Sequence, residues 1–129
     1  MADSSRLYTS EKLSSSLINC VTQDKYGFMW IGTEYGLSKF DGYKFTNYLH
    51  NSKDTTSIAD NIISSFLVDK KGRLWIGCAK GLMRYNSTND NFIQYHFPDG
   101  RKPRIYDIIE SKNGDILMGT AGFGLYSIK

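Results

Sequence analysis

The sequence predicts an all-β fold, a partial β-propeller of about three four-stranded antiparallel blades, and three observations predict it. One motif occurs three times, centred on Gly32, Gly77 and Gly119, at intervals of 45 and 42 residues. Each interval contains short apolar runs separated by turn residues, as four strands require. No 3.6-residue apolar stripe runs longer than one helical turn. Self-similarity at a period of just over about 40 residues, with four strands per repeat, is typical of propeller blades.

The first two strands of each repeat are predicted to form a hairpin around an Asp-x-x-Gly turn. The apolar runs that open the repeats are residues 17–23, 62–68 and 105–110. Asp24 and Asp69 follow the first two runs, Ser111 follows the third, and a glycine comes three positions later in each. An Asp carboxylate accepts from backbone N–H groups two residues on, and Gly adopts positive φ, so this pattern favours a tight turn.

A second hairpin is predicted after the first. Residues 37–40 alternate apolar and polar side chains, as a half-buried strand does. Asp41-Gly42 is the preferred filling of a two-residue type I′ turn, so residues 44–48 are expected to form the fourth strand. The Phe-x-x-Tyr pattern of this strand returns at residues 92–95.

The whole chain, residues 1–129, is predicted to be one propeller fragment. Its blades are residues 17–48, 62–95 and 105–128, and residues 6–9 resemble a detached outer strand. Known propellers have roughly four to eight blades, so three blades indicate a fragment, an open arc or a ring of several copies. Because the end blades of such an arc expose apolar faces, we expect self-association, most simply as a homodimer with six blades.

Composition excludes several classes of partner. A net charge of +3, from 16 basic and 13 acidic residues, does not mark a nucleic-acid binder. Cys20 and Cys78 occupy non-equivalent positions in their repeats, so a disulfide between them is not expected, and no Cys/His spacing suits zinc. No apolar run reaches about 18 residues, so no membrane span is expected in this chain.

No catalytic centre is predicted. His50 and His96 follow two outer strands and are interpreted as loop histidines, with no nucleophile motif nearby. The repeated aspartates are explained by their turns. Trp30 and Trp75 occupy identical blade positions and are expected to pack between blades. We therefore predict a protein that is not an enzyme and needs no cofactor or metal.

A ligand site is predicted on one face of the blades. Successive turns of a blade alternate between two faces, so the turns after second strands share a face with the long connections between blades. Longer loops carry more variable chemistry, as ligand loops do. A sugar needs a flat apolar surface with polar partners around it. The candidate residues on this face are Tyr35, Lys80, Arg104 and Phe123.

The motif G-x-x-W-I-G-T-x-x-G-L, with Asp three residues ahead of its first glycine, resembles the two-component regulator propeller repeat. Residues 13–45 look like the first blade of a sensor from a Bacteroides hybrid two-component system, and residues 57–63 look like the entry to its second. The resemblance covers residues 6–129. Cys78 replaces the usual Thr, and Leu117 replaces Trp in the third copy.

The resemblance implies a periplasmic, ligand-sensing propeller. In that family about fourteen repeats form two propellers, followed by an immunoglobulin-like domain, a membrane helix and a cytoplasmic histidine kinase, and the ligands are usually oligosaccharides. This chain would be a non-catalytic piece of the sensor. The alternative is a stand-alone, self-assembling binding module that acts as a lectin-like or protein-docking scaffold. Propeller-borne hydrolase or lyase chemistry is the least favoured hypothesis, because catalytic groups are missing.

Overall fold

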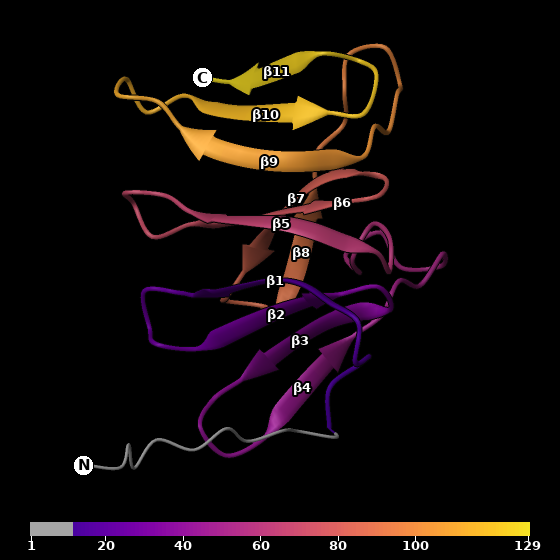
Figure 1. Cartoon of the computed structure of the whole chain (residues 1–129), viewed down its shortest axis with the longest axis vertical. Helices are drawn as coiled ribbons and strands as arrows, with labels where there is room; N and C mark the ends of the chain where they lie inside the picture. The colour runs from indigo at the N-terminus through magenta and orange to yellow at the C-terminus, as the bar shows by residue number, and fades with distance from the viewer. Residues whose placement is uncertain (1–11) are drawn as a thin grey trace, which may run out of the picture.

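Three antiparallel sheets stand one above another in the computed structural model, which describes residues 12–129 (Figure 1). The first sheet has the order β1-β2-β3-β4, the second β5-β6-β7-β8 and the third β11-β10-β9. The strands are β1 (Ile18–Gln23), β2 (Met29–Thr33), β3 (Gly36–Phe40), β4 (Phe45–Tyr48), β5 (Ile63–Val68), β6 (Leu74–Cys78), β7 (Gly81–Asn86), β8 (Asn91–Gln94), β9 (Ile105–Glu110), β10 (Ile116–Thr120) and β11 (Leu125–Ile128). The predicted partial propeller is therefore confirmed. Each strand for which the sequence predicted a residue range begins and ends within one residue of that range.

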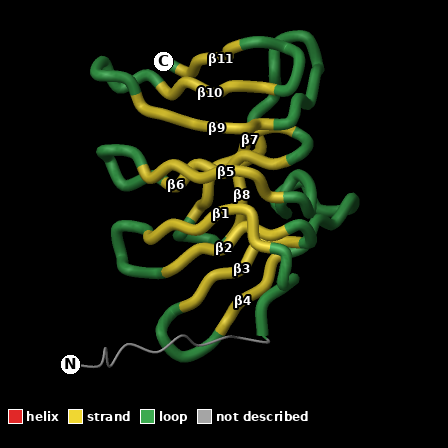
Figure 2. The backbone as a smooth tube through the Cα atoms, viewed as in Figure 1, coloured by secondary structure: helices red, strands yellow, loops and turns green. Residues whose placement is uncertain are grey.

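The described residues contain strands joined by turns and loops, and no helix (Figure 2). In residues 12–129 there is accordingly no helix that could cross a membrane. The predicted outer strand at residues 6–9 lies outside the described residues. Within them, β11 is an edge strand of the third sheet.

The first strands of the blades, β1, β5 and β9, lie side by side along one edge of the stack (Figure 1). Each carries a one-residue bulge near its start, and two of the bulge residues reach the next blade. Asn19 Nδ2 donates to Ile63 O at 2.9 Å, and Ser64 Oγ donates to Ile105 O. These two hydrogen bonds thus set the position of each blade relative to the next.

The turns separate onto two faces (Figure 1). We call the turn face the side with the β1–β2, β3–β4, β5–β6 and β9–β10 turns, at residues 24–28, 41–44, 69–73 and 111–115. The loop face carries residues 34–35, 79–80 and 121–124 between second and third strands, and the connections 49–62 and 95–104. The Asp-x-x-Gly turns form as predicted. Asp24 Oδ1, for example, accepts from the backbone N–H groups of Tyr26 and Phe28 at 2.9 and 3.0 Å.

The predicted two-residue type I′ turn at Asp41-Gly42 is wrong. Phe40 pairs with Phe45, so the connection is a four-residue loop. A type I′ turn needs positive φ at both central residues, whereas only Gly42 has it, at 101°. Asp41 Oδ1 instead accepts from the N–H groups of Tyr43 and Lys44, both at 2.9 Å, and these bonds hold the wider loop together.

Two apolar clusters fill the spaces between the sheets. The first contains Trp30, Leu37, Ile58, Ile63, Leu74, Ile76, Cys78, Met83 and Phe92. The second contains Trp75, Leu82, Phe97, Ile105, Ile108, Ile116 and Met118. Both tryptophans are buried between blades, as predicted, with exposed fractions of 0% and 2%. Stability therefore depends on blade-to-blade contact, as it does in repeat proteins generally.

Candidate functional site

The four predicted ligand residues lie on the loop face but do not form one pocket. Tyr35 and Phe123 are exposed in the β2–β3 and β10–β11 connections. Arg101 stacks over the Phe123 ring at 4.5 Å, and the guanidinium of Arg104 lies 5.8 Å from the Tyr106 ring. Lys80 lines a pocket with other residues, whereas Tyr35, Phe123 and Arg104 do not line it.

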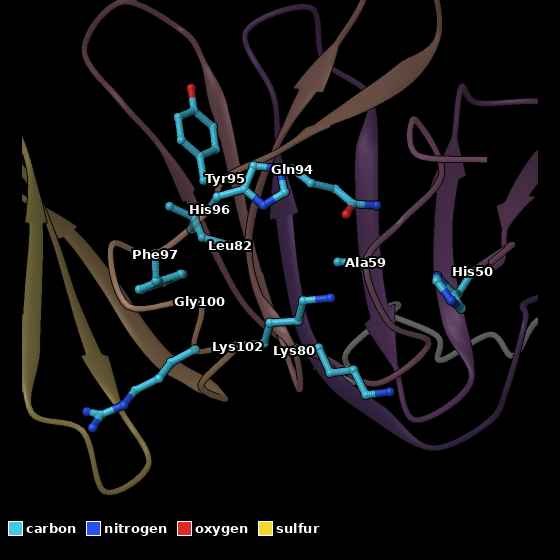
Figure 3. A pocket seen from close by; sticks show the side chains of 11 residues that line it. His50, Ala59, Lys80, Leu82, Gln94, Tyr95, His96, Phe97, Gly100 and Lys102 are labelled. Carbon is cyan, nitrogen blue, oxygen red and sulfur yellow. The ribbon is translucent and has the colours of Figure 1, made fainter. Parts of the chain in front are cut away.

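This loop-face pocket has a volume of about 100 Å³ and a cationic lining (Figure 3). Its basic side chains come from the connections after β4 and β8 and from the β6–β7 turn. They are His50, Lys80, His96, Arg101 and Lys102. Carboxylates compensate part of this charge, since Asp60 Oδ1 lies 3.9 Å from Lys80 Nζ and Asp99 Oδ2 lies 3.0 Å from Arg101 Nε. The pocket suits one small anionic group rather than an extended ligand.

The two histidines are in loops, as predicted, but they also share this pocket. His50 Nδ1 lies 2.7 Å from Ile58 O, which orients the ring. The sequence carried a signal for this shared lining, because the two histidines follow the fourth strands of neighbouring blades. Sequence reasoning did not use that equivalence.

A larger cavity lies on the turn face between the first and second sheets. This turn-face cleft has a volume of about 620 Å³, within the roughly 300–1,000 Å³ of ordinary small-molecule sites. It is lined by Asp24, Lys25, Tyr26, Phe28, Lys39, Gly72, Arg73, Leu74, Tyr85, Ser87 and Asp90. Aromatic rings and charged groups therefore stand together at the junction of two blades.

Lys39 is the central cation of the cleft. Its Nζ lies 5.4 Å from the centroid of the Phe28 ring and 5.5 Å from that of Tyr85, within cation–π range. The same Nζ lies 3.3 Å from Tyr85 Oη and 3.6 Å from Asp90 Oδ1. These contacts join β3 of the first blade to β7 and the β7–β8 turn of the second.

Asp90 accepts hydrogen bonds from two tyrosine hydroxyls that belong to different blades. Tyr48 and Tyr85 each donate to Asp90 Oδ1 at 2.6 Å. Burial and the bond to Asp90 raise the pKa of both tyrosines well above the ordinary value of 10.0. Burial alone would raise the pKa of Asp90, but the bonds from Tyr48 and Tyr85 and the charge of Lys39 outweigh it, so that pKa lies below 3.8. At neutral pH Asp90 is thus a carboxylate, and the phenols of Tyr48 and Tyr85 are neutral.

The repeated aspartates also hold the tryptophans, which sequence reasoning missed. Asp24 Oδ2 accepts from Trp30 Nε1, and Asp69 Oδ2 accepts from Trp75 Nε1, both at 2.9 Å. A signal was present in the sequence, because the third repeat replaces Asp and Trp together, by Ser111 and Leu117. Both aspartates are thus engaged in structural bonds, and Asp24 also lines the turn-face cleft.

The described part of the chain holds neither a metal-ligand cluster nor a reactive thiol. No group of three or more His, Cys, Asp or Glu side chains in residues 12–129 is arranged to hold a metal ion. Both cysteines are free, and burial raises the pKa of Cys20 to about 11 and of Cys78 to about 12. Such thiols are protonated at neutral pH and are poor nucleophiles.

Sequence comparison connects the repeat to a known family. The profile of the two component regulator propeller matches residues 12–35 and 57–80, which are equivalent parts of the first two blades. Histidine kinase P4 of Formosa agariphila is 49% identical over 47 residues. That match covers 36% of this chain and 3% of the kinase.

Structure comparison extends the match to nearly the whole chain. The extracellular domain of a putative hybrid two component system from B. thetaiotaomicron superposes with a TM-score of 0.82 at 28% identity. The match covers 97% of this chain and 18% of that one. Virginiamycin B lyase from Staphylococcus aureus shares the fold alone, with a TM-score of 0.59 at 19% identity over 88% of this chain and 41% of the lyase.

The chain thus spans under a fifth of the length of the kinase and of the extracellular domain that it matches. Its blades follow the fold of that domain at 28% identity, whereas the likeness to the lyase, at 19% identity, is one of fold only. Two segments of the chain therefore match the two component regulator propeller repeat, and the whole described fold is similar to part of the extracellular domain of a putative hybrid two component system from B. thetaiotaomicron.

Proposed function

We propose that this chain is a non-catalytic, ligand-reading segment of the periplasmic propeller of a hybrid two component histidine kinase. The observation that carries the proposal is the match to the B. thetaiotaomicron extracellular domain over 97% of the chain. The local identity to histidine kinase P4 supports the same assignment. Kinase activity would belong to other parts of the protein, and this segment would contribute binding surface.

The ligand proposed is an oligosaccharide, and the turn-face cleft is the site whose chemistry favours one. Tyr26 and Phe28 offer flat apolar surfaces, with ring centroids 6.4 Å apart. Lys39, Arg73 and Ser87 offer donors in the same cavity. A volume of about 620 Å³ accommodates one or two sugar rings, whereas the loop-face pocket is several times smaller.

The loop face predicted from the sequence remains the second candidate site. Its pocket favours one anionic substituent, held by Lys80, Lys102 and His96. Tyr35, Phe123 and Arg104 are then outlying contacts of a ligand that extends beyond the pocket. The two sites therefore favour different ligands. The turn-face cleft suits sugar rings, and the loop-face pocket suits a charged group.

The site is tested by calorimetric titration of the chain with neutral and acidic oligosaccharides, using three matched variants. Tyr26 is 61% exposed, so Tyr26→Ala removes one cleft wall with little effect on folding. Lys80→Ala removes a cation from the loop-face pocket. Tyr43, 95% exposed and lining neither cavity, provides the control Tyr43→Ala. We expect binding that Tyr26→Ala weakens at least about tenfold and that the other two variants leave unchanged.

Other outcomes of this titration are equally informative. Loss of binding in Lys80→Ala alone would move the site to the loop face. Turnover of a glycan by the chain would contradict the non-catalytic assignment. The stand-alone module, the alternative function, is distinguished by the gene, since further repeats followed by a membrane helix and a kinase belong to a sensor.

A further inference from the structure

The loop-face pocket is lined by charged groups of one sign. Five of its eleven lining residues are basic, and none is Asp or Glu. The whole sequence has 13 acidic residues against 16 basic ones, so the lining departs from the average composition of the chain. The turn-face cleft carries both signs, since Asp24 and Asp90 line it together with Lys39. Positive charge is therefore gathered in the loop-face pocket without a carboxylate in its lining.

Three of the basic side chains are available to bind a ligand. The side chains of Lys102 and His96 make no hydrogen bond, ion pair or ring contact with another residue in 12–129. Lys80 Nζ has one carboxylate near it, Asp60 Oδ1 at 3.9 Å, which is close to the limit of an ion pair. Because like charges repel, cations that share a cavity in this way favour the arrival of an anion.

The other two basic residues of the pocket are committed to other partners. Arg101 Nε lies 3.0 Å from Asp99 Oδ2, and its guanidinium lies over the Phe123 ring. His50 Nδ1 lies 2.7 Å from Ile58 O, and a carbonyl oxygen only accepts, so Nδ1 carries the proton. In the neutral ring, Nε2 of His50 is then an acceptor and does not favour an anion.

The walls of the pocket are fixed by the fold. Leu82 and Phe97 line it, are 1% and 9% exposed, and belong to the second apolar cluster. Gln94 Nε2 donates to Ser57 O at 2.9 Å, which ties the 49–62 connection to β8. All lining residues fall within positions 50–102, so the outer faces of the first and third blades take no part. The cations thus stand beside an apolar floor, where they attract an anion more strongly than in open water.

The size of the pocket restricts the ligand to a small group. Its volume of about 100 Å³ exceeds the roughly 30 Å³ share of one water but is well below the roughly 300 Å³ at which ordinary small-molecule sites begin. Figure 3 shows the two lysines, Lys80 and Lys102, at one side of the pocket and His96 at the other. Ammonium groups act as compact point charges toward oxoanions, and an imidazole N–H adds a directed donor.

We propose that the loop-face pocket is a site for one tetrahedral oxoanion, phosphate or sulfate, held by Lys80, Lys102 and His96. The oxoanion is either a free ion or an ester group carried by a sugar, since both present the same oxygen atoms. The pocket is a second site that is filled together with the turn-face cleft, and not an alternative to it. The inference goes beyond the proposed function and does not depend on it, because an oxoanion occupies this pocket whether or not the cleft binds a sugar.

The test is calorimetric titration of the chain with sodium phosphate and with sodium sulfate, at neutral pH and at an ionic strength held constant with sodium chloride. Lys80→Gln and Lys102→Gln each remove one cation of the site, and both lysines are exposed. Lys44→Gln and Lys112→Gln remove the same charge from exposed positions on the turn face that line neither cavity. Far-UV circular dichroism checks that every variant folds.

The proposal expects a dissociation constant of about 1 mM or tighter for at least one of the two ions or for the ester described below. Lys80→Gln and Lys102→Gln should each weaken binding at least about fivefold, because each removes a charge-assisted hydrogen bond. The two control variants, and Tyr26→Ala in the turn-face cleft, should stay within about twofold of the wild type. Equal weakening in the control variants would mean diffuse attraction to a basic protein and would overturn the proposal.

A sulfated monosaccharide and its unsulfated parent distinguish the two sources of the oxoanion. Binding of the free ions shows that the ion alone is sufficient. Binding of the sulfated sugar, without its parent and without the free ions, assigns the pocket to an ester group, provided that Lys80→Gln and Lys102→Gln weaken it. Both results support the proposal. Failure of phosphate, sulfate and the sulfated sugar to bind would overturn it and would leave the turn-face cleft untouched as the sugar site.

Discussion

Trp75 donates its indole N–H to Asp69 across 2.9 Å, and Trp30 makes the same bond to Asp24 one blade earlier. The aspartate therefore has two tasks, since its other oxygen closes the hairpin turn by accepting from backbone N–H groups. The bond connects the tight turn of a blade to the large side chain at the blade interface. A polar handle of this kind is what a buried tryptophan needs.

Asp69→Asn should lower the free energy of unfolding by about 1–3 kcal/mol, because its amide nitrogen cannot accept from Trp75 Nε1. The third repeat suggests the compensating change, since Ser111 and Leu117 stand there together. In a double-mutant cycle with Asp69→Ser and Trp75→Leu, we expect the double variant to cost less than the sum of the single variants. Denaturant unfolding curves of the four proteins measure this coupling, and strict additivity would show that the two residues act independently.

Protonation of Asp69 should make the free energy of unfolding depend on pH. Burial by itself would raise the pKa of this carboxyl, but the bonds from Trp75 and Arg73 outweigh it and hold the pKa below 3.8. A group whose pKa is lower in the folded state stabilises the protein above its unfolded pKa, and that stability is lost as the pH falls through the folded pKa. At pH values under about 4, we expect the free energy of unfolding to decrease with falling pH. This decrease should be steeper in the wild type than in Asp69→Asn. Equal slopes in the two proteins would contradict this assignment.

Tyr48→Phe should weaken the contact between the first two blades by about 1 kcal/mol, since it removes one of the two hydroxyl bonds to Asp90. The penalty stays small because the Asp90 side chain is 54% exposed and keeps its bond to Tyr85. Tyr43→Phe, at a side chain 95% exposed, is the matched control and should be neutral. Thermal unfolding of both variants tests this. If Tyr48→Phe is as stable as Tyr43→Phe, the bond from Tyr48 to Asp90 does not contribute to stability.

Both cysteines should resist thiol reagents at neutral pH while the chain is folded. Burial raises the pKa of Cys20 to about 11 and of Cys78 to about 12, so the reactive thiolate is scarce. Labelling with a chromogenic disulfide should be slow in buffer and fast in denaturant. Rapid labelling of the native protein would mean that the first interface opens readily.

The repeat made most of the fold predictable, because strand positions could be aligned across three copies. The loop at Asp41 was predicted wrongly. The Asp-Gly pair favours a two-residue turn, but here Asp41 accepts hydrogen bonds from the N–H groups of Tyr43 and Lys44, and these bonds stabilise a longer loop. The loop face was predicted from turn order, which the repeat fixes. The turn-face cleft was not, because Tyr26, Lys39 and Asp90 come together only through the packing of one blade on the next.

The central claim is that each blade interface rests on a glycine beneath an isoleucine, and Gly77→Ala compared with Gly119→Ala tests it most directly. At Gly77 an added Cβ would lie 2.3 Å from Ser65 Oγ and 2.7 Å from Ile105 Cγ2, whereas at Gly119 it would meet no atom within 4 Å. Gly77→Ala should lose about 1–3 kcal/mol of unfolding free energy. Gly119→Ala should stay within about 0.5 kcal/mol of the wild type. Equal losses in the two variants would contradict the account.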